Sequence, residues 1–266
     1  MKKTFLFFLL LLPFLSFSQT DFSNRWEDFF SYNTVKDFLT VNDKIYALTD
    51  NAVFTYNTNT NETEKLSSIN GLSGETTSAI HFNNSNRRLV IGYETGLMEV
   101  VNEDGRIKIS SDIVNFNQSG EKRINHISEL NNKLYISTPF AVVVYDIDKL
   151  EFGDTYFIGA NSTSVKINQT LIANNQIFAA TENGIYVASL SNPNLIDFNN
   201  WQLLFAGNYS NITRFNTSIY KSKGADLIKI TVTNYTLTPQ GEIHGKLKST
   251  KRRGSLADAV SSVFIL

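Results

Sequence analysis

Hydrophobic and polar residues alternate in short runs along this chain, and the runs recur at a nearly constant spacing. The segments KIYALTDNAVFTYN (44–57), KLYISTPFAVVVYD (133–146) and QIFAATENGIYVAS (176–189) each hold two alternating stretches around a tight turn. Alternation enriched in β-branched and aromatic residues is typical of strands, and a short turn between two strands indicates a hairpin. Beyond residue 18 no stretch keeps the 3.6-residue periodicity of an amphipathic helix.

Five residues, which we call the anchors, mark the repeat. They are the first apolar residues of the five copies, Ile45, Leu89, Leu134, Ile177 and Ile219, at spacings of 44, 45, 43 and 42 residues. Seven positions after the anchor a small residue stands in four of the five copies, and an aliphatic residue follows it in every copy. A period in the low forties that is built of strands predicts the blades of a β-propeller. We expect the five anchors to be equivalent and buried.

A further apolar run precedes each anchor and another follows each hairpin, so every copy holds four predicted strands. The chain is therefore predicted to be all-β, with about five four-stranded blades over residues 24–240. Because a propeller closes its ring and rings of six to eight blades are commoner, we expect an incomplete part of a larger ring. Residues 241–266 include the basic run 246–253 and lack the blade pattern. We predict a non-propeller tail there, either disordered or produced by truncation or a frameshift.

The N-terminus has the organisation of a secretory signal peptide. Lys2 and Lys3 precede an apolar stretch broken by Pro13, and small residues before Gln19 suit a signal peptidase. The apolar stretch is shorter than the roughly 20 residues of a membrane-spanning helix. We therefore predict a signal peptide at residues 1–18, export to the periplasm or the outer cell surface, and no transmembrane helix after its removal.

The composition and motifs give little support for catalysis. The chain has no Cys, three His residues and balanced charge, with 24 Lys and Arg against 25 Asp and Glu. Balanced charge does not favour nucleic acid as a partner. The sequence has no phosphate-binding glycine motif, no His pair at metal-ligand spacing and no Gly-x-Ser-x-Gly elbow. We predict a non-enzymatic protein without a cofactor or metal.

One polar position recurs inside the otherwise apolar runs that precede the anchors. Eight residues before the five anchors stand Asp37, His81, His126, Gln169 and Asn211. Repeat symmetry would place these side chains in a ring near the central channel of a propeller, where small ligands commonly bind. They form a candidate ligand ring. The alternative is a hydrated channel wall that any polar residue would satisfy.

Particular stretches of the first two copies resemble the N-terminal propeller of the PorZ family of the type IX secretion system of the Bacteroidetes. These stretches are Trp26, Ser31-Tyr32-Asn33, KIYALTDNAVFTYN, LSSINGLS and LVIGYETG. The resemblance covers residues 24–240 and extends more loosely to the propeller repeats of two-component regulators. It implies an exported protein of the surface attachment complex that helps deliver anionic lipopolysaccharide to the sortase. It also implies protein partners in that complex and an anionic glycolipid as ligand.

Two other functions remain open at the level of sequence. The first is an extracytoplasmic ligand-sensing propeller of a two-component regulator, and the second is a polysaccharide-active propeller enzyme. A downstream transmembrane helix and kinase would favour the regulator. A cluster of acidic residues in the channel would favour the enzyme, and the sequence does not indicate one.

Overall fold

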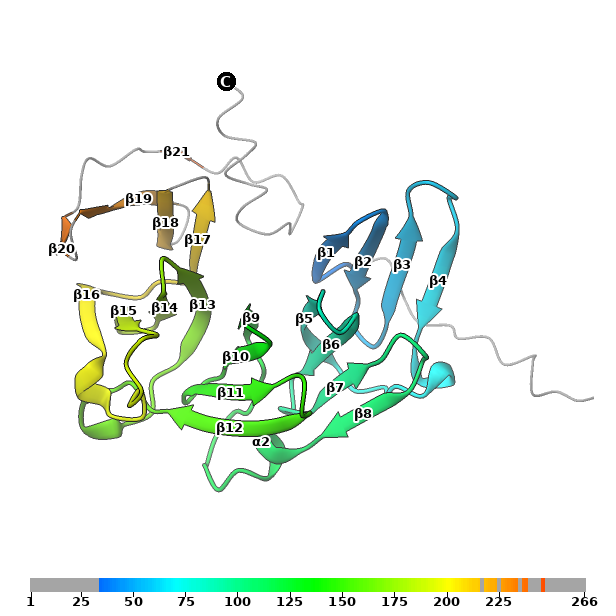
Figure 1. Ribbon diagram of the computed structural model, residues 1–266, viewed down its shortest axis with the longest axis horizontal. Coiled ribbons are helices and arrows are strands. Elements are labelled where there is room, and N and C mark those ends of the chain that lie inside the picture. The colour runs from blue at the N-terminus through cyan, green and yellow to red at the C-terminus, as the bar shows by residue number, and fades with distance from the viewer. Residues whose placement is uncertain (1–33, 216–217, 224–225, 234–235, 239–244, 247–266) are drawn as a thin grey trace, which may run out of the picture.

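Five antiparallel sheets fan out side by side in an open arc in the computed structural model (Figure 1). The structure describes residues 34–215, 218–223, 226–233, 236–238 and 245–246. Each sheet is one predicted blade, and its four strands follow one another from the inside of the arc to the outside. The sequence prediction of an all-β fold with four-stranded blades is therefore confirmed, and the described blades do not close into a ring.

The strands of one blade are consecutive in sequence and antiparallel to their neighbours. Blades 1 and 2 consist of β1 (Asp37–Val41), β2 (Lys44–Leu48), β3 (Val53–Asn57), β4 (Thr63–Leu66), β5 (Thr77–Asn83), β6 (Arg88–Tyr93), β7 (Met98–Val101) and β8 (Ile107–Ser110). Blades 3 and 4 consist of β9 (His126–Leu130), β10 (Lys133–Ser137), β11 (Val142–Asp146), β12 (Glu151–Tyr156), β13 (Ile167–Ala173), β14 (Gln176–Thr181), β15 (Gly184–Ser189) and β16 (Gln202–Ala206).

Blade 5 consists of β17 (Asn211–Phe215), β18 (Ser218–Lys223), β19 (Asp226–Thr233) and β20 (Thr236–Thr238). A short strand from the predicted tail, β21 (Gly245–Lys246), pairs with β19. The links between blades carry the short helix α2 (Asp112–Asn115) and the 3₁₀ turns η3 (Ser68–Asn70) and η4 (Ala160–Ser162). The 3₁₀ turn η5 (Phe198–Asn200) lies within blade 4, between β15 and β16. The rest of the tail and the predicted signal peptide lie outside the described residues.

Buried threonines hold the tight turns between the second and third strands of three blades. Thr49, Thr138 and Thr181 are at most 1% exposed, and each hydroxyl donates to the carbonyl of the residue three positions later, at 2.8–3.0 Å. These side-chain hydrogen bonds satisfy backbone groups of the turn, so the turn does not need a glycine. The same turn therefore forms at Asn51-Ala52 as at Asn183-Gly184.

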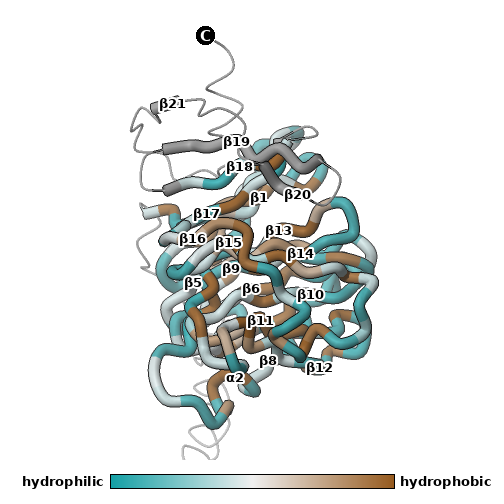
Figure 2. The backbone as a smooth tube through the Cα atoms, turned by 90° about the vertical axis from the view of Figure 1, so that its left-hand side faces the viewer, coloured by the Kyte–Doolittle hydropathy of each residue, from teal (hydrophilic) through white to brown (hydrophobic). Residues whose placement is uncertain are grey.

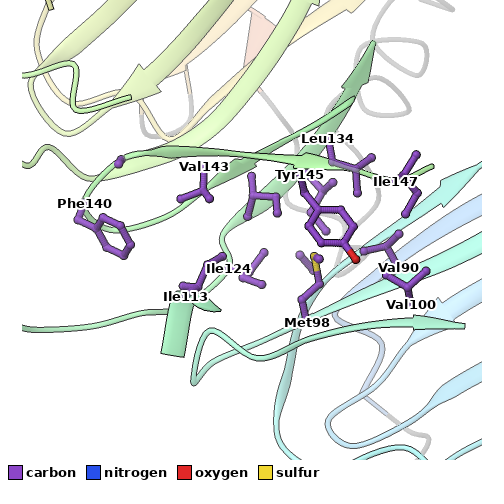
Figure 3. Packing of buried hydrophobic residues seen from close by; sticks show 14 residues of the cluster. Val90, Met98, Val100, Ile113, Ile124, Leu134, Phe140, Val143, Tyr145 and Ile147 are labelled. Carbon is purple, nitrogen blue, oxygen red and sulfur yellow. The ribbon is translucent and has the colours of Figure 1, made fainter. Parts of the chain in front are cut away.

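Alternate residues of each strand face opposite neighbouring blades, which gives one hydrophobic cluster between each pair of consecutive blades. Leu134 belongs to the cluster between blades 2 and 3, while the next residue, Tyr135, belongs to the cluster between blades 3 and 4. Figure 3 shows Tyr145 of β11 pointing toward Met98 and Val100 of β7 across the first of these interfaces. The anchors thus face the preceding blade, and the residues after them face the following blade.

Four anchors are buried as predicted, but the prediction for Ile45 is wrong. Leu89, Leu134, Ile177 and Ile219 are at most 5% exposed, whereas Ile45 is only half-buried. Since anchors face the preceding blade and Ile45 belongs to the first described blade, no described residue packs against that face as a further blade would. The backbone hydropathy in Figure 2 follows the same scheme, with hydrophobic strands inside and hydrophilic segments in many connecting loops.

Candidate functional site

The first strands of the blades, β1, β5, β9, β13 and β17, lie side by side along the inside of the arc. They run in the same direction, so all of them begin at one mouth of the channel and end at the other. We call the mouth where they begin the entry mouth. The candidate ligand ring was predicted for this part of the fold.

Four of the five predicted ring residues occupy equivalent positions, and His81 does not. Asp37, His126, Gln169 and Asn211 each pair with the residue three positions after the anchor of their blade. His81 instead pairs with Val90, one position after its anchor. The turn between β5 and β6 holds residues 84–87, whereas the β1–β2, β9–β10 and β13–β14 turns hold two residues each. The two extra residues shift the register by two, and Ala79 occupies the equivalent position.

The ring residues of blades 3 and 4 contact each other, and Gln169 also binds the backbone of blade 5. Its side-chain nitrogen lies 3.4 Å from Nε2 of His126, and its oxygen accepts the backbone N–H of Ile212 at 3.2 Å. The amide of Asn211 donates to Ser222 within its own blade at 3.3 Å, and Asp37 accepts the backbone N–H of Phe38 at 2.8 Å. The structure thus brings two ring residues, His126 and Gln169, into contact, and the role of the ring in ligand binding stays a prediction.

His126 and His81 have different environments. Nδ1 of His126 is buried and has no hydrogen-bond partner among the described residues. Burial, and secondly the nearby His81, lowers the pKa of His126 to about 4 from its ordinary value of 6.5. His126 is therefore neutral at pH 7. Nε2 of His81 lies 2.6 Å from a carboxylate oxygen of Glu129 in the next blade.

A regular series of hydrogen bonds joins consecutive blades at the entry mouth, and sequence analysis did not predict it. The donor is the side chain just before the ring position, and the acceptor is the carbonyl two residues before the ring position in the next blade. The four bonds are Lys36 to Thr77, Ser78 to Ile124, Asn125 to Ile167 and Asn168 to Tyr209, at 2.7–2.8 Å. The sequence has polar residues at this position in the other blades. In blade 2 the longer β5–β6 turn moves the donor, Ser78, two positions away from the expected count.

Next to these bonds a polar cavity of about 500 Å³ opens at the entry mouth. The donors Asn125 and Asn168 line it through side chains whose nitrogen is already bonded, so their amide oxygens remain as acceptors. Ser210 adds a hydroxyl at the next equivalent position. The cavity therefore offers hydrogen-bonding groups from three blades.

Two cations line this cavity, and only one of them is paired. Arg123 lies 2.5 Å from Glu94 of the preceding blade. Lys166 occupies the same repeat position as Arg123, but Pro139 stands where the preceding blade would supply the acid. In the part of the chain that the structure describes, the Lys166 ammonium forms no ion pair, and Glu182 binds the backbone N–H of Lys166 instead, at 3.2 Å. The half-buried Lys166 can therefore bind an anionic group. Glu121 lines the same cavity and adds an exposed carboxylate, which can accept hydrogen bonds from a ligand.

Two other features were sought among the described residues, a metal site and a membrane-spanning helix. No cluster of three or more His, Asp and Glu side chains within the described ranges is arranged to bind a metal ion. Helices long and apolar enough to cross a membrane are likewise missing from this part of the chain.

Five four-stranded sheets around their first strands define the chain as a sector of a β-propeller. The sequence profile described as "TSS9, PorZ, N-terminal beta-propeller domain" matches residues 45–202, which is more than half of the chain. The chain therefore belongs to the family of PorZ N-terminal β-propeller domains of the type IX secretion system. No curated protein sequence matches it.

Solved structures with the same fold include a secretion component and regulator domains. PorZ, an essential surface component of the type IX secretion system of Porphyromonas gingivalis, is 19% identical with a TM-score of 0.66, over 77% of this chain and 27% of that chain. The extracellular domain of the hybrid two-component system BT4673 from B. thetaiotaomicron is 14% identical with a TM-score of 0.62, over 85% of this chain and 30% of that chain. The chain thus spans under a third of either relative.

Proposed function

We propose that this protein is an exported, non-enzymatic component of the type IX secretion machinery that binds an anionic glycolipid at the entry mouth. In this role it assists delivery of anionic lipopolysaccharide to the sortase of the surface attachment complex, whose proteins are its partners. Membership in the PorZ propeller family supports the secretion role over the sensor of a two-component regulator, which shares only the fold.

The observation that carries the proposal is the unpaired Lys166 in a cavity lined by amide oxygens. A carboxylate or phosphate on a sugar would pair with the ammonium of Lys166. The hydroxyl groups of the same sugar would donate to Asn125, Asn168 and Glu121. An anionic saccharide has both kinds of group, whereas a simple lipid chain would find few apolar partners in this cavity.

Binding of purified anionic lipopolysaccharide to the full-length protein tests the proposal, with neutral lipopolysaccharide as the comparison ligand. We expect Lys166→Gln to weaken binding of the anionic form by about tenfold, since a charge-assisted hydrogen bond is lost. Lys149→Gln, which removes an exposed lysine from the distant β11–β12 turn, should leave binding unchanged. Equal affinity of wild type and Lys166→Gln, or no preference for the anionic form, would refute the proposal.

A second pair of variants tests the same cavity without removing the lysine. Pro139→Glu would supply the acid that blades 2 and 4 carry at this position, as Glu94 and Glu182. The new carboxylate should pair with Lys166 and weaken binding of the anionic ligand, while Pro139→Gln should have a much smaller effect on binding. Identical binding by the Glu and Gln variants would contradict this assignment of Lys166.

A further inference from the structure

A second groove lies at the opposite mouth of the channel, between the β1–β2 and β5–β6 hairpins of blades 1 and 2. Its volume is about 260 Å³, below the roughly 300–1,000 Å³ of pockets that enclose drug-sized ligands. A groove of this size suits a single ring. It shares no lining residue with the cavity at the entry mouth.

Two aromatic side chains form the apolar part of this groove. The rings of Tyr46 and Phe82 line it with centroids 5.6 Å apart and planes tilted by 32°. Both rings are half-buried and pack against the hydrophobic cluster between blades 1 and 2. The core therefore fixes the rings while part of each remains accessible to a ligand.

Polar groups without protein partners surround the rings. The carboxylate of Asp43 and the side-chain amide of Asn84 form no hydrogen bond or ion pair within the described ranges, and both residues are exposed. Asn57 uses its side-chain oxygen for the backbone N–H groups of residues 59 and 60, which leaves its NH₂ group free. Thr58 holds the Asp43 carbonyl at 2.8 Å, so the turn that presents the carboxylate is fixed.

The cations near the groove are already engaged. Lys44 lies 3.3 Å from Glu64, and Arg87 lies 2.7 Å from Glu103. A ligand that depends on phosphate would therefore meet the free carboxylate of Asp43 without a free cation to balance it. This charge arrangement favours a neutral ligand.

We propose that this groove binds one neutral hexopyranose residue. The C–H face of a pyranose ring is apolar and packs against aromatic rings, here those of Tyr46 and Phe82. Its hydroxyl groups both donate and accept hydrogen bonds, so they match the acceptor Asp43 and the amides of Asn57 and Asn84. The site is independent of the anion-binding cavity and does not rest on the proposed function.

Saturation-transfer NMR on the full-length protein with the methyl pyranosides of glucose, galactose and mannose tests this proposal. We expect transfer to the ring C–H protons of at least one of them, at millimolar affinity. Asp43→Asn should lower the affinity for that glycoside by about tenfold, because a charged hydrogen-bond acceptor is lost. The variant keeps the shape of the side chain, and the Asp43 carbonyl that binds Thr58 belongs to the backbone, so the turn is unchanged.

Two further variants control for position and folding. Asn84→Ala changes an exposed loop residue of the groove and should also weaken binding. Asp154→Asn makes the same charge change as Asp43→Asn at an exposed position on β12 and should leave binding unchanged. Absence of transfer to all three glycosides would overturn the proposal. So would wild-type affinity in both groove variants, or an equal loss in Asp154→Asn.

Discussion

The half-buried imidazole of His126, whose Nδ1 is inaccessible and has no hydrogen-bond partner among the described residues, should make the protein less stable as the pH falls from neutral. His126→Gln is the informative substitution, because Gln169 occupies the equivalent position in blade 4 and shows that the site accepts a neutral amide. The glutamine can still accept the hydrogen bond that the side-chain nitrogen of Gln169 offers to the ring. The variant therefore removes the titrating group with little change in packing.

The size of the effect follows from the two pKa values of His126. Burial and the nearby His81 lower the pKa to about 4 in the native state, whereas the unfolded chain has the ordinary value of 6.5. Above the unfolded pKa both states are neutral and the group contributes nothing to the pH dependence. As the pH falls, the unfolded state takes up the proton first, so the native state loses about 2 kcal/mol by about pH 5 and about 3 kcal/mol in total.

Urea unfolding of wild type and His126→Gln at about pH 7.5, 6 and 5 measures this contribution. The carboxylates titrate in both proteins, so their effect cancels in the difference between the two. We expect the variant to gain about 2 kcal/mol relative to wild type between the highest and the lowest of these pH values. Parallel loss of stability in the two proteins would refute the assignment of a depressed pKa to His126.

Three further substitutions test the packing between blades by the same unfolding measurement at neutral pH. Leu134→Asp should abolish cooperative unfolding, because it places an unpaired charge at a fully buried anchor; a cooperative transition near that of wild type would contradict the interface. Asn125→Ala should lower the free energy of unfolding by about 1–3 kcal/mol, since the Ile167 carbonyl loses its donor, and an unchanged value would show that the bond adds nothing. Gly96→Ala should cost roughly 1–3 kcal/mol, because Gly96 has a φ of 90° and a Cβ there would lie 2.7 Å from the Lys122 carbonyl; wild-type stability would show that the turn relaxes freely.

The sequence was sufficient to predict the fold because hydrophobic alternation and period report the same interfaces that hold the blades together. Every copy has two consecutive apolar residues at the positions of Leu134 and Tyr135, because one packs on the preceding blade and the other on the following blade. This pattern can be seen within a single strand. Burial of Ile45 was predicted by analogy with the other anchors and is wrong. The burial of an anchor depends on the preceding blade, and no pattern within its own copy contains that information.

The candidate ring shows how a count of residues differs from a register. His81 stands eight residues before its anchor, as the other four do, but the longer β5–β6 turn moves it two positions along the strand. The hydrophobic pattern does not reveal such a shift, because a shift of two residues leaves every side chain on the same face of the strand. The hydrogen bonds between blades were missed for a related reason, because their partners lie in different copies of the repeat.

Departures from the repeat are more informative about ligands than the repeat itself. Residues that recur from blade to blade, such as the anchors and the four donors to the next blade, are explained by the contacts between blades. Lys166 recurs in type but lacks its partner because Pro139 replaces an acid, and the resulting free ammonium lies in a cavity. Asp43 likewise replaces the asparagine of blades 3 and 4 and places a free carboxylate beside two aromatic rings. Contacts within the fold do not explain the free ammonium of Lys166 or the free carboxylate of Asp43. We therefore propose that each of these groups binds a ligand.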